Sequence, residues 1–177
     1  MPLWQRKVPH TSPLFCGGLF GSKPDGGVVL IDKAVALNPN FAAGWFLGGF
    51  LQIWRGEHDD AIKRFERAMR LSPLDPEMFR MHAGVAIVHL LAGRFDDASS
   101  TAEKAFRDFP GFLIVVATMA ASHALAGRAD EARRAMDRLR QLDPALSISN
   151  LHDLLPLHRP QDLALLTEGL RRAGLPE

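Results

Sequence analysis

Apolar residues recur every three or four positions through most of the chain after residue 28, with polar residues between them. Ile62, Phe65, Ala68 and Met69 form one such stripe, and the residues between them are mostly charged. This period is typical of an amphipathic α-helix with one face in a core. The pattern predicts an all-α fold, with a lone helix near 28–38 and helix pairs near 41–72, 75–109 and 111–143.

Glycine, alanine and proline mark these helix pairs at a repeated spacing. A glycine (56, 93, 127) is followed five residues later by an alanine (61, 98, 132) and seventeen residues later by a proline (73, 110, 144). Glycine accepts the left-handed conformation that ends a helix, and proline stops the second helix of the pair. Acidic pairs that follow each glycine suit a helix N-terminus, where they can accept from free N–H groups. The successive glycines are 37 and 34 residues apart, so the chain repeats a helix–turn–helix unit.

A helix–turn–helix unit of about 34 residues resembles the tetratricopeptide repeat. The tyrosine that this family places before the glycine is replaced here by Gln52, His89 and His123. The resemblance implies a right-handed α-solenoid of helix pairs that is closed by a C-terminal capping helix. The matching residues are Trp45, Gly49, Gly56, Ala61, Phe65, Ala68 and Pro73; Ala86, Gly93, Ala98, Ala105 and Pro110; and Ala120, Gly127, Ala132 and Pro144.

A further resemblance covers roughly residues 28–177. The stretches "ALNPNFAAGW", "HLLAGRFDDA" and "RPQDLALLTEGLRRAGLPE" are similar to the repeat region that follows the catalytic domain of rhizobial-type class III adenylate cyclases. Residues 1–27 are too few for a cyclase domain and contain no paired metal-binding aspartates. This resemblance implies a non-catalytic regulatory module in bacterial signalling.

Three regions follow from these patterns. Residues 1–27 are rich in proline and glycine and are predicted to form an irregular arm. Residues 28–146 form the repeat array, as a partial unit and three helix pairs. Residues 147–177 break the repeat and contain a final amphipathic helix with Leu163, Leu166 and Leu170 on one side. A solenoid needs a cap for its last apolar face, but this helix can equally fold back into the groove.

The resemblance also indicates where a binding site lies, because tetratricopeptide arrays line their concave groove with the first helix of each pair. The resulting strip is apolar and lacks the basic and amide residues that clamp a peptide carboxylate. A strip of this length is expected to be covered by the C-terminal segment, by a second copy or by a signalling partner. The predicted groove residues are Ala43, Phe46, Phe50, Ile53 and Trp54; Arg80, Ala83, Ile87, Leu90 and Leu91; and Ile114, Ala117, Ala121, Ala124 and Leu125.

Phe46, Phe50 and Trp54 stand four residues apart, one above the other on a helix. They indicate either a hot spot for a partner helix or an ordinary core. The partial first unit also leaves this end of the array open. Apolar residues of the arm can cover it in the same molecule or in a swapped dimer: Leu3, Trp4, Leu14, Phe15, Leu19 and Phe20.

Composition and candidate chemistry argue against most other classes of protein. The formal net charge is +1, so nucleic acid and anionic membranes are not expected partners. The seven histidines form no metal-ligand spacing, and Cys16 has no identifiable base, so we predict no enzyme, metal or cofactor. No run reaches the roughly 20 apolar residues of a membrane span, and the sequence around Cys16 fits neither a signal peptide nor a lipoprotein anchor.

The sequence therefore predicts a cytoplasmic protein–protein interaction module. Two alternatives remain at this point. One is a self-associating homodimeric scaffold, and the other is the repeat remnant of a transcriptional regulator.

Overall fold

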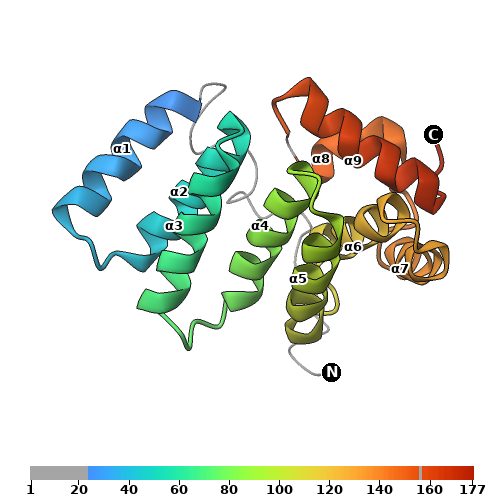
Figure 1. Cartoon of the computed structure of the whole chain (residues 1–177), viewed down its shortest axis with the longest axis horizontal. Coiled ribbons are helices and arrows are strands. Elements are labelled where there is room, and N and C mark those ends of the chain that lie inside the picture. The colour runs from blue at the N-terminus through green and yellow to red at the C-terminus, as the bar shows by residue number, and fades with distance from the viewer. Residues whose placement is uncertain (1–23, 156) are drawn as a thin grey trace.

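The computed structural model describes residues 24–155 and 157–177, and every regular element in these residues is helical (Figure 1). The predicted cover by apolar residues of the arm lies outside the described residues. The elements are α1 (Pro24–Leu37), α2 (Ala42–Arg55), α3 (His58–Leu71), α4 (Met78–Leu91), α5 (Phe95–Asp108), α6 (Leu113–Leu125), α7 (Ala129–Leu142), the short 3₁₀ helix η2 (Ile148–Asn150), α8 (Leu151–Leu154) and α9 (Pro160–Ala173).

The helices form the predicted α-solenoid. Three hairpins, α2–α3, α4–α5 and α6–α7, stand side by side, and α1 packs against the first of them (Figure 1). We call the first helix of each hairpin an A helix (α2, α4, α6) and the second a B helix (α3, α5, α7). α1 corresponds to a B helix. It begins at Pro24, four residues before the predicted boundary, because proline fits the first turn, where no intrahelical N–H bond is needed.

Glycine closes the turn inside each hairpin as predicted. Gly56, Gly93 and Gly127 have φ of +79°, +75° and +78°, a region that favours glycine. The acidic pairs lie at the start of each B helix, as predicted, but they are not its N-cap residues. The N-caps of the B helices are Glu57, Arg94 and Arg128, and none makes a side-chain capping bond. The acidic pairs lie in the first turn, where they favour the helix through its dipole.

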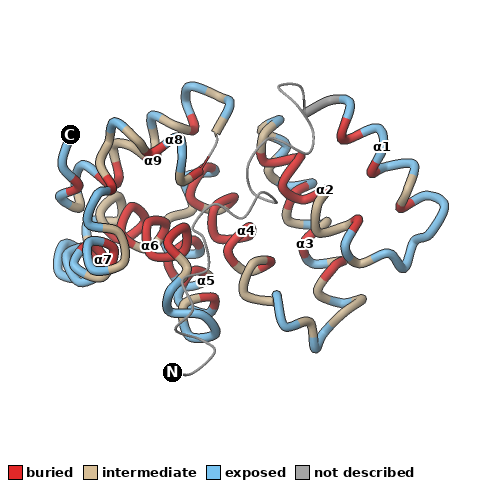
Figure 2. The backbone as a smooth tube through the Cα atoms, turned by 180° about the vertical axis from the view of Figure 1, so that it is seen from behind, coloured by how far each residue is buried: buried red, intermediate tan, exposed pale blue. Residues whose placement is uncertain are grey.

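A and B helices differ in how much of their surface is apolar. The B helix α3 buries Ala61, Phe65 and Ala68 and exposes a charged face. The A helix α6 buries ten of its thirteen residues. Figure 2 shows buried positions running along α4 and α6. A helix that is apolar on all sides must be covered on all sides, so the A helices need contacts beyond their own B helices.

Phe65 holds the first two hairpins together. Its side chain is fully buried between α2 and α4, where Gly49 and Gly84 leave space for the ring. A Cβ at Gly49 would lie 2.7 Å from the Phe65 ring. The two glycines therefore set how closely the A helices approach this B helix.

A polar clamp connects the second and third hairpins to the unit before each. Arg94 Nε donates to His89 Nδ1 at 2.9 Å, and Arg128 Nε donates to His123 Nδ1 at 3.0 Å. Arg128 also bonds to Asp96 and donates to Ser99 Oγ at 2.8 Å, on the preceding B helix. Two histidines that replace the family's tyrosine thus orient arginines that bridge neighbouring units.

Candidate binding face

The structure places the predicted groove residues, which we call the A-helix face, in and around one continuous apolar core. Most of them are buried members of the largest core cluster, and Phe46, Trp54 and Leu125 pack against it while partly exposed. Ala83 lies in a second cluster with residues of α5 and α6, so it contributes to packing between hairpins. Ala43 is exposed and Ala124 is partly exposed. The buried members are Phe50, Ile53, Ile87, Leu90, Leu91, Ile114, Ala117 and Ala121.

The C-terminal segment lies on this face. α9 packs mainly against α6 and also contacts α4 and α7 (Figure 1). Gly169 sits directly on the last turns of α6, since a Cβ there would lie 2.8 Å from the Ala121 Cβ and 3.0 Å from the Leu125 Cδ1. Leu166 and Leu170, on either side of this contact, are almost fully buried. The final helix therefore folds back over the A helices instead of stacking as the next repeat.

Polar groups fix the N-terminal end of α9 at the turn between α2 and α3. The Arg159 guanidinium occupies the space beside Gly56, where any Cβ would overlap it. The Trp54 and His158 rings meet edge to face with centroids 5.8 Å apart. Asp162 is only 4% exposed, and its carboxylate lies 3.7 Å from Arg159. This anchor was not predicted, because the sequence pattern indicates only the helix start at Pro160 and not the residues that its N-terminal end contacts.

Backbone contacts hold the other end of the segment. Ile148 N–H donates to the Pro176 carbonyl at 2.8 Å, and the Arg140 guanidinium donates to the Gly174 carbonyl. Gly174 ends α9 in the left-handed conformation with φ of +98°. Leu175 then turns back into the core. The direction of α9 across the A helices is thus set at both ends.

Three aromatic rings meet at the α2 part of the face. Phe46 and Phe50 have ring centroids 5.3 Å apart, and Phe50 and Phe65 are 5.0 Å apart, both edge to face. Phe50 is buried, whereas Phe46 and Trp54 keep part of their surface exposed. The predicted aromatic stripe thus combines a core residue with two residues that contribute to the surface.

Arg80 is the charged residue among the predicted groove positions. Its Nε lies 2.7 Å from a carboxylate oxygen of Glu77, three residues earlier. Its guanidinium also lies over the Phe79 ring, 5.7 Å from the centroid. The Glu77 carboxylate partly balances the charge of Arg80, and the other predicted groove positions are apolar.

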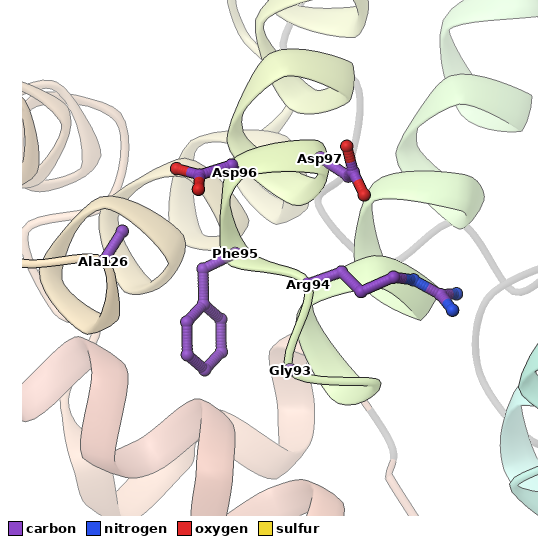
Figure 3. A pocket seen from close by; sticks show the side chains of 6 residues that line it. All are labelled: Gly93, Arg94, Phe95, Asp96, Asp97 and Ala126. Carbon is purple, nitrogen blue, oxygen red and sulfur yellow. The ribbon is translucent and has the colours of Figure 1, made fainter.

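A cavity of about 400 Å³ lies at the turn between α4 and α5 (Figure 3). Asp96 points toward Ala126 on the neighbouring turn, whereas Arg94 and Asp97 lie on the other side (Figure 3). Arg94 bonds to His89, and Asp96 to Arg128. Because the charged groups diverge and two of them are already paired, this cavity has no convergent set of ligand groups. It is lined by Gly93, Arg94, Phe95, Asp96, Asp97 and Ala126.

Burial lowers the pKa of four histidines: His58, His82, His89 and His123. Nearby arginines lower the pKa of His89 and His123 further. The neutral form is therefore favoured, as Nδ1 must be an acceptor for the arginine of each clamp. Within residues 24–155 and 157–177 no cluster of histidine and acidic side chains can hold a metal ion.

No helix in the part of the chain that the structure describes is long and apolar enough to cross a bilayer.

Comparisons with known proteins identify the family of the repeats and the fold. Residues 89–155 match the family model of the tetratricopeptide repeat. The CTR9 homolog protein of Arabidopsis thaliana is 30% identical over 115 residues, which are 64% of this chain and 10% of that protein. The chain thus spans about a tenth of the length of this relative.

Solved structures share the architecture at low sequence identity. MamA from Desulfovibrio magneticus is 16% identical with a TM-score of 0.64, over 86% of this chain and 84% of that one. YrrB, described as a TPR protein with an unusual peptide-binding site, is 16% identical with a TM-score of 0.57, over 84% and 77% of the two chains. The described chain therefore has the fold of a tetratricopeptide-repeat solenoid, and residues 89–155 carry that repeat.

Proposed function

We propose that this tetratricopeptide-repeat protein is a non-catalytic interaction module that binds an apolar helix or peptide of another protein on its A-helix face. One observation carries the proposal. α6 is apolar on almost all sides, and its surface turned toward the C-terminal segment already accepts an amphipathic helix, α9. A face that packs one such helix has the chemistry to pack another.

Recognition on this face depends on burial and shape. The apolar positions offer no hydrogen-bond donors, and Arg80 is paired with Glu77. Each apolar Å² that a partner covers contributes roughly 25 cal/mol, from which the cost of association is subtracted. Trp54 and Phe46 are the strongest anchors, because large aromatic side chains dominate the binding energy of interfaces. The peptide-binding site named for YrrB, which shares this fold, supports the same use here.

A resemblance in the sequence supports one setting for this activity. The likeness to the repeat region of rhizobial-type cyclases favours a cytoplasmic role in bacterial signalling, in which the module captures a helix of a regulatory partner. No separate observation favours the alternative in which the chain is the repeat remnant of a transcriptional regulator.

A homodimeric scaffold is the second candidate function, and the exposed apolar side chains of α1 favour it. Val29, Leu30 and Leu37 are 53%, 64% and 88% exposed on the outer side of the first described helix. Two copies can bury these residues against each other. The mass of the full chain in solution, measured by light scattering over a range of concentrations, separates this candidate from a monomeric module.

Selection of helical peptides on the full chain tests the main proposal. We expect apolar amphipathic peptides to be enriched from a phage-displayed library, and their affinity to fall at least about tenfold in Trp54→Glu. Lys63→Glu is the matched control, since it places the same carboxylate on the exposed face of α3. Peptides whose binding is unaffected by Trp54→Glu, or no enrichment at all, would exclude the A-helix face as the binding site.

A further inference from the structure

The contact between α9 and α6 depends on a small residue between two leucines. Leu166 and Leu170 are buried one turn apart, and Gly169 lies between them against Ala121 and Leu125. An alanine at position 169 would bring its Cβ to 2.8 Å from the Ala121 Cβ. Because Ala121 is part of a packed helix, it cannot move away as a long flexible side chain can. The α6 surface therefore selects a helix with the pattern Leu-x-x-Gly-Leu.

α9 is attached through few buried residues, as many as α5 and α7 bury, but unlike them it is not part of a hairpin. Four of its fourteen residues are buried, namely Asp162, Leu166, Gly169 and Leu170. α6 beneath it buries ten of thirteen. Releasing α9 leaves each hairpin with its own A and B helices in contact. Elements with few buried contacts open at a low free-energy cost, and α9 can leave without breaking a hairpin, so it can be exchanged for another helix.

The anchor at the N-terminal end gives this helix a defined orientation. Arg159 fits beside Gly56, and the buried Asp162 carboxylate lies in the first turn of α9, where the helix dipole favours it. Asp162 raises the pKa of His58, although burial keeps that pKa below its usual range. An incoming helix that places an arginine and an acid at its start can use the same groups.

We infer that α9 is a displaceable intramolecular ligand, and that the partner of this module is an amphipathic helix that repeats the Leu-x-x-Gly-Leu pattern of α9. This inference rests on the proposed function and specifies its partner. The closed form covers Ala121 and Leu125 with the chain's own helix, and the open form exposes them to the partner. The partner's apparent Kd equals its Kd for the open form divided by the fraction of molecules that are open. A chain that is about 1% open therefore binds the partner roughly a hundredfold more weakly than one that is fully open.

A labelled peptide with the sequence of residues 159–177 tests this inference on the full chain. Gly169→Val in the full chain is expected to release α9 and to expose the α6 surface. Fluorescence anisotropy should then show binding of the wild-type peptide at least about tenfold tighter than to the wild-type chain. A peptide that itself carries Gly169→Val should not bind. Ala164→Val is the matched control, because it makes a similar change on the exposed side of the same helix.

Hydrogen exchange on the same samples reports the position of α9 directly. Faster exchange is expected for residues 160–173 in Gly169→Val, with α2 to α7 still protected. Gly169→Ala is a milder variant, for which the same changes are expected to be smaller. It replaces Gly169→Val in the experiment if the valine variant does not fold. Unchanged exchange of α9 in both variants, or an opened chain that does not bind the wild-type peptide, would overturn the inference. If library peptides still bind the chain in a Trp54-dependent way, the proposed function stands without it.

Discussion

The two ends of the helical array are finished in different ways. At the C-terminal end, α9 lies on α6, and α7 presents a charged surface with Arg133 and Arg134 exposed. At the N-terminal end, α1 exposes Val29, Leu30 and Leu37. The buried apolar side chains of α1 are Val28, Ile31 and Val35, which meet Leu51 of α2. A repeat array always has terminal surfaces that lack a neighbouring unit. Within residues 24–155 and 157–177, the surface of α7 at one end is charged, and the surface of α1 at the other end keeps apolar side chains exposed.

Alanine substitutions at matched leucines should give the largest difference between the ends. Leu170→Ala removes a fully buried side chain and leaves a cavity, so we expect a loss of about 2–5 kcal/mol in the free energy of unfolding. Leu30→Ala acts on an exposed side chain, and we expect a change below about 0.5 kcal/mol. Urea denaturation followed by circular dichroism measures both. Equal losses at the two positions would mean that α1 is buried in solution.

Substitutions of the glycines at the hairpin turns should have effects of intermediate size on the free energy of unfolding. Gly56 and Gly127 have nearly the same positive φ, but only Gly56 has the Arg159 guanidinium beside it. Alanine at either position should cost roughly 1 kcal/mol from backbone strain. Gly56→Ala should cost more than Gly127→Ala, and it alone should increase hydrogen exchange at the start of α9. Identical effects would show that Arg159 does not contribute to holding the segment.

Acid should weaken the clamps of the second and third hairpins, whereas the first hairpin has Gln52 at the same position. The pKa of His89 and His123 is lowered in the folded state, so the unfolded chain takes up protons first. Their contribution to stability is complete above the unfolded pKa of about 6.5 and is lost as the pH falls from there toward the folded pKa. We expect a lower urea midpoint at pH 5.5 than at pH 7.5. In His89→Gln/His123→Gln this difference should shrink. If it does not, other groups cause the acid sensitivity.

Charged residues on α1 should have the smallest effect on stability. Leu30→Lys/Leu37→Lys changes two exposed side chains, so the free energy of unfolding should change by less than about 0.5 kcal/mol per site. Binding of an apolar dye should nevertheless decrease, because the patch on α1 becomes charged. Light scattering on the same pair of proteins shows whether the patch joins two copies. A dimer that becomes a monomer in the double variant would support the scaffold function.

Much of the fold can be predicted from local patterns. The glycine at each hairpin turn requires a positive φ, and the proline that follows limits the second helix, so the hairpin bounds were predicted to within three residues. The same register predicts that the aromatic residues of α2 line the groove, and in the structure Phe50 is buried while Phe46 and Trp54 are partly exposed. It assigned Ala83 to the groove, although this residue packs between hairpins, because a helix that is apolar on all sides has no polar face to indicate its orientation.

The sequence by itself determined the helices, their pairing and the apolar character of the A-helix face, because these depend on periodicity and on turn residues within one repeat. Only the tertiary structure decided where α9 lies. Its leucine stripe fits either the end of the array or the groove, and a stripe does not identify the surface that covers it. The choice depends on the fit of Gly169 to Ala121 and of Arg159 to Gly56, between residues that are 48 and 103 positions apart. Such complementarity exists only after the hairpins have packed.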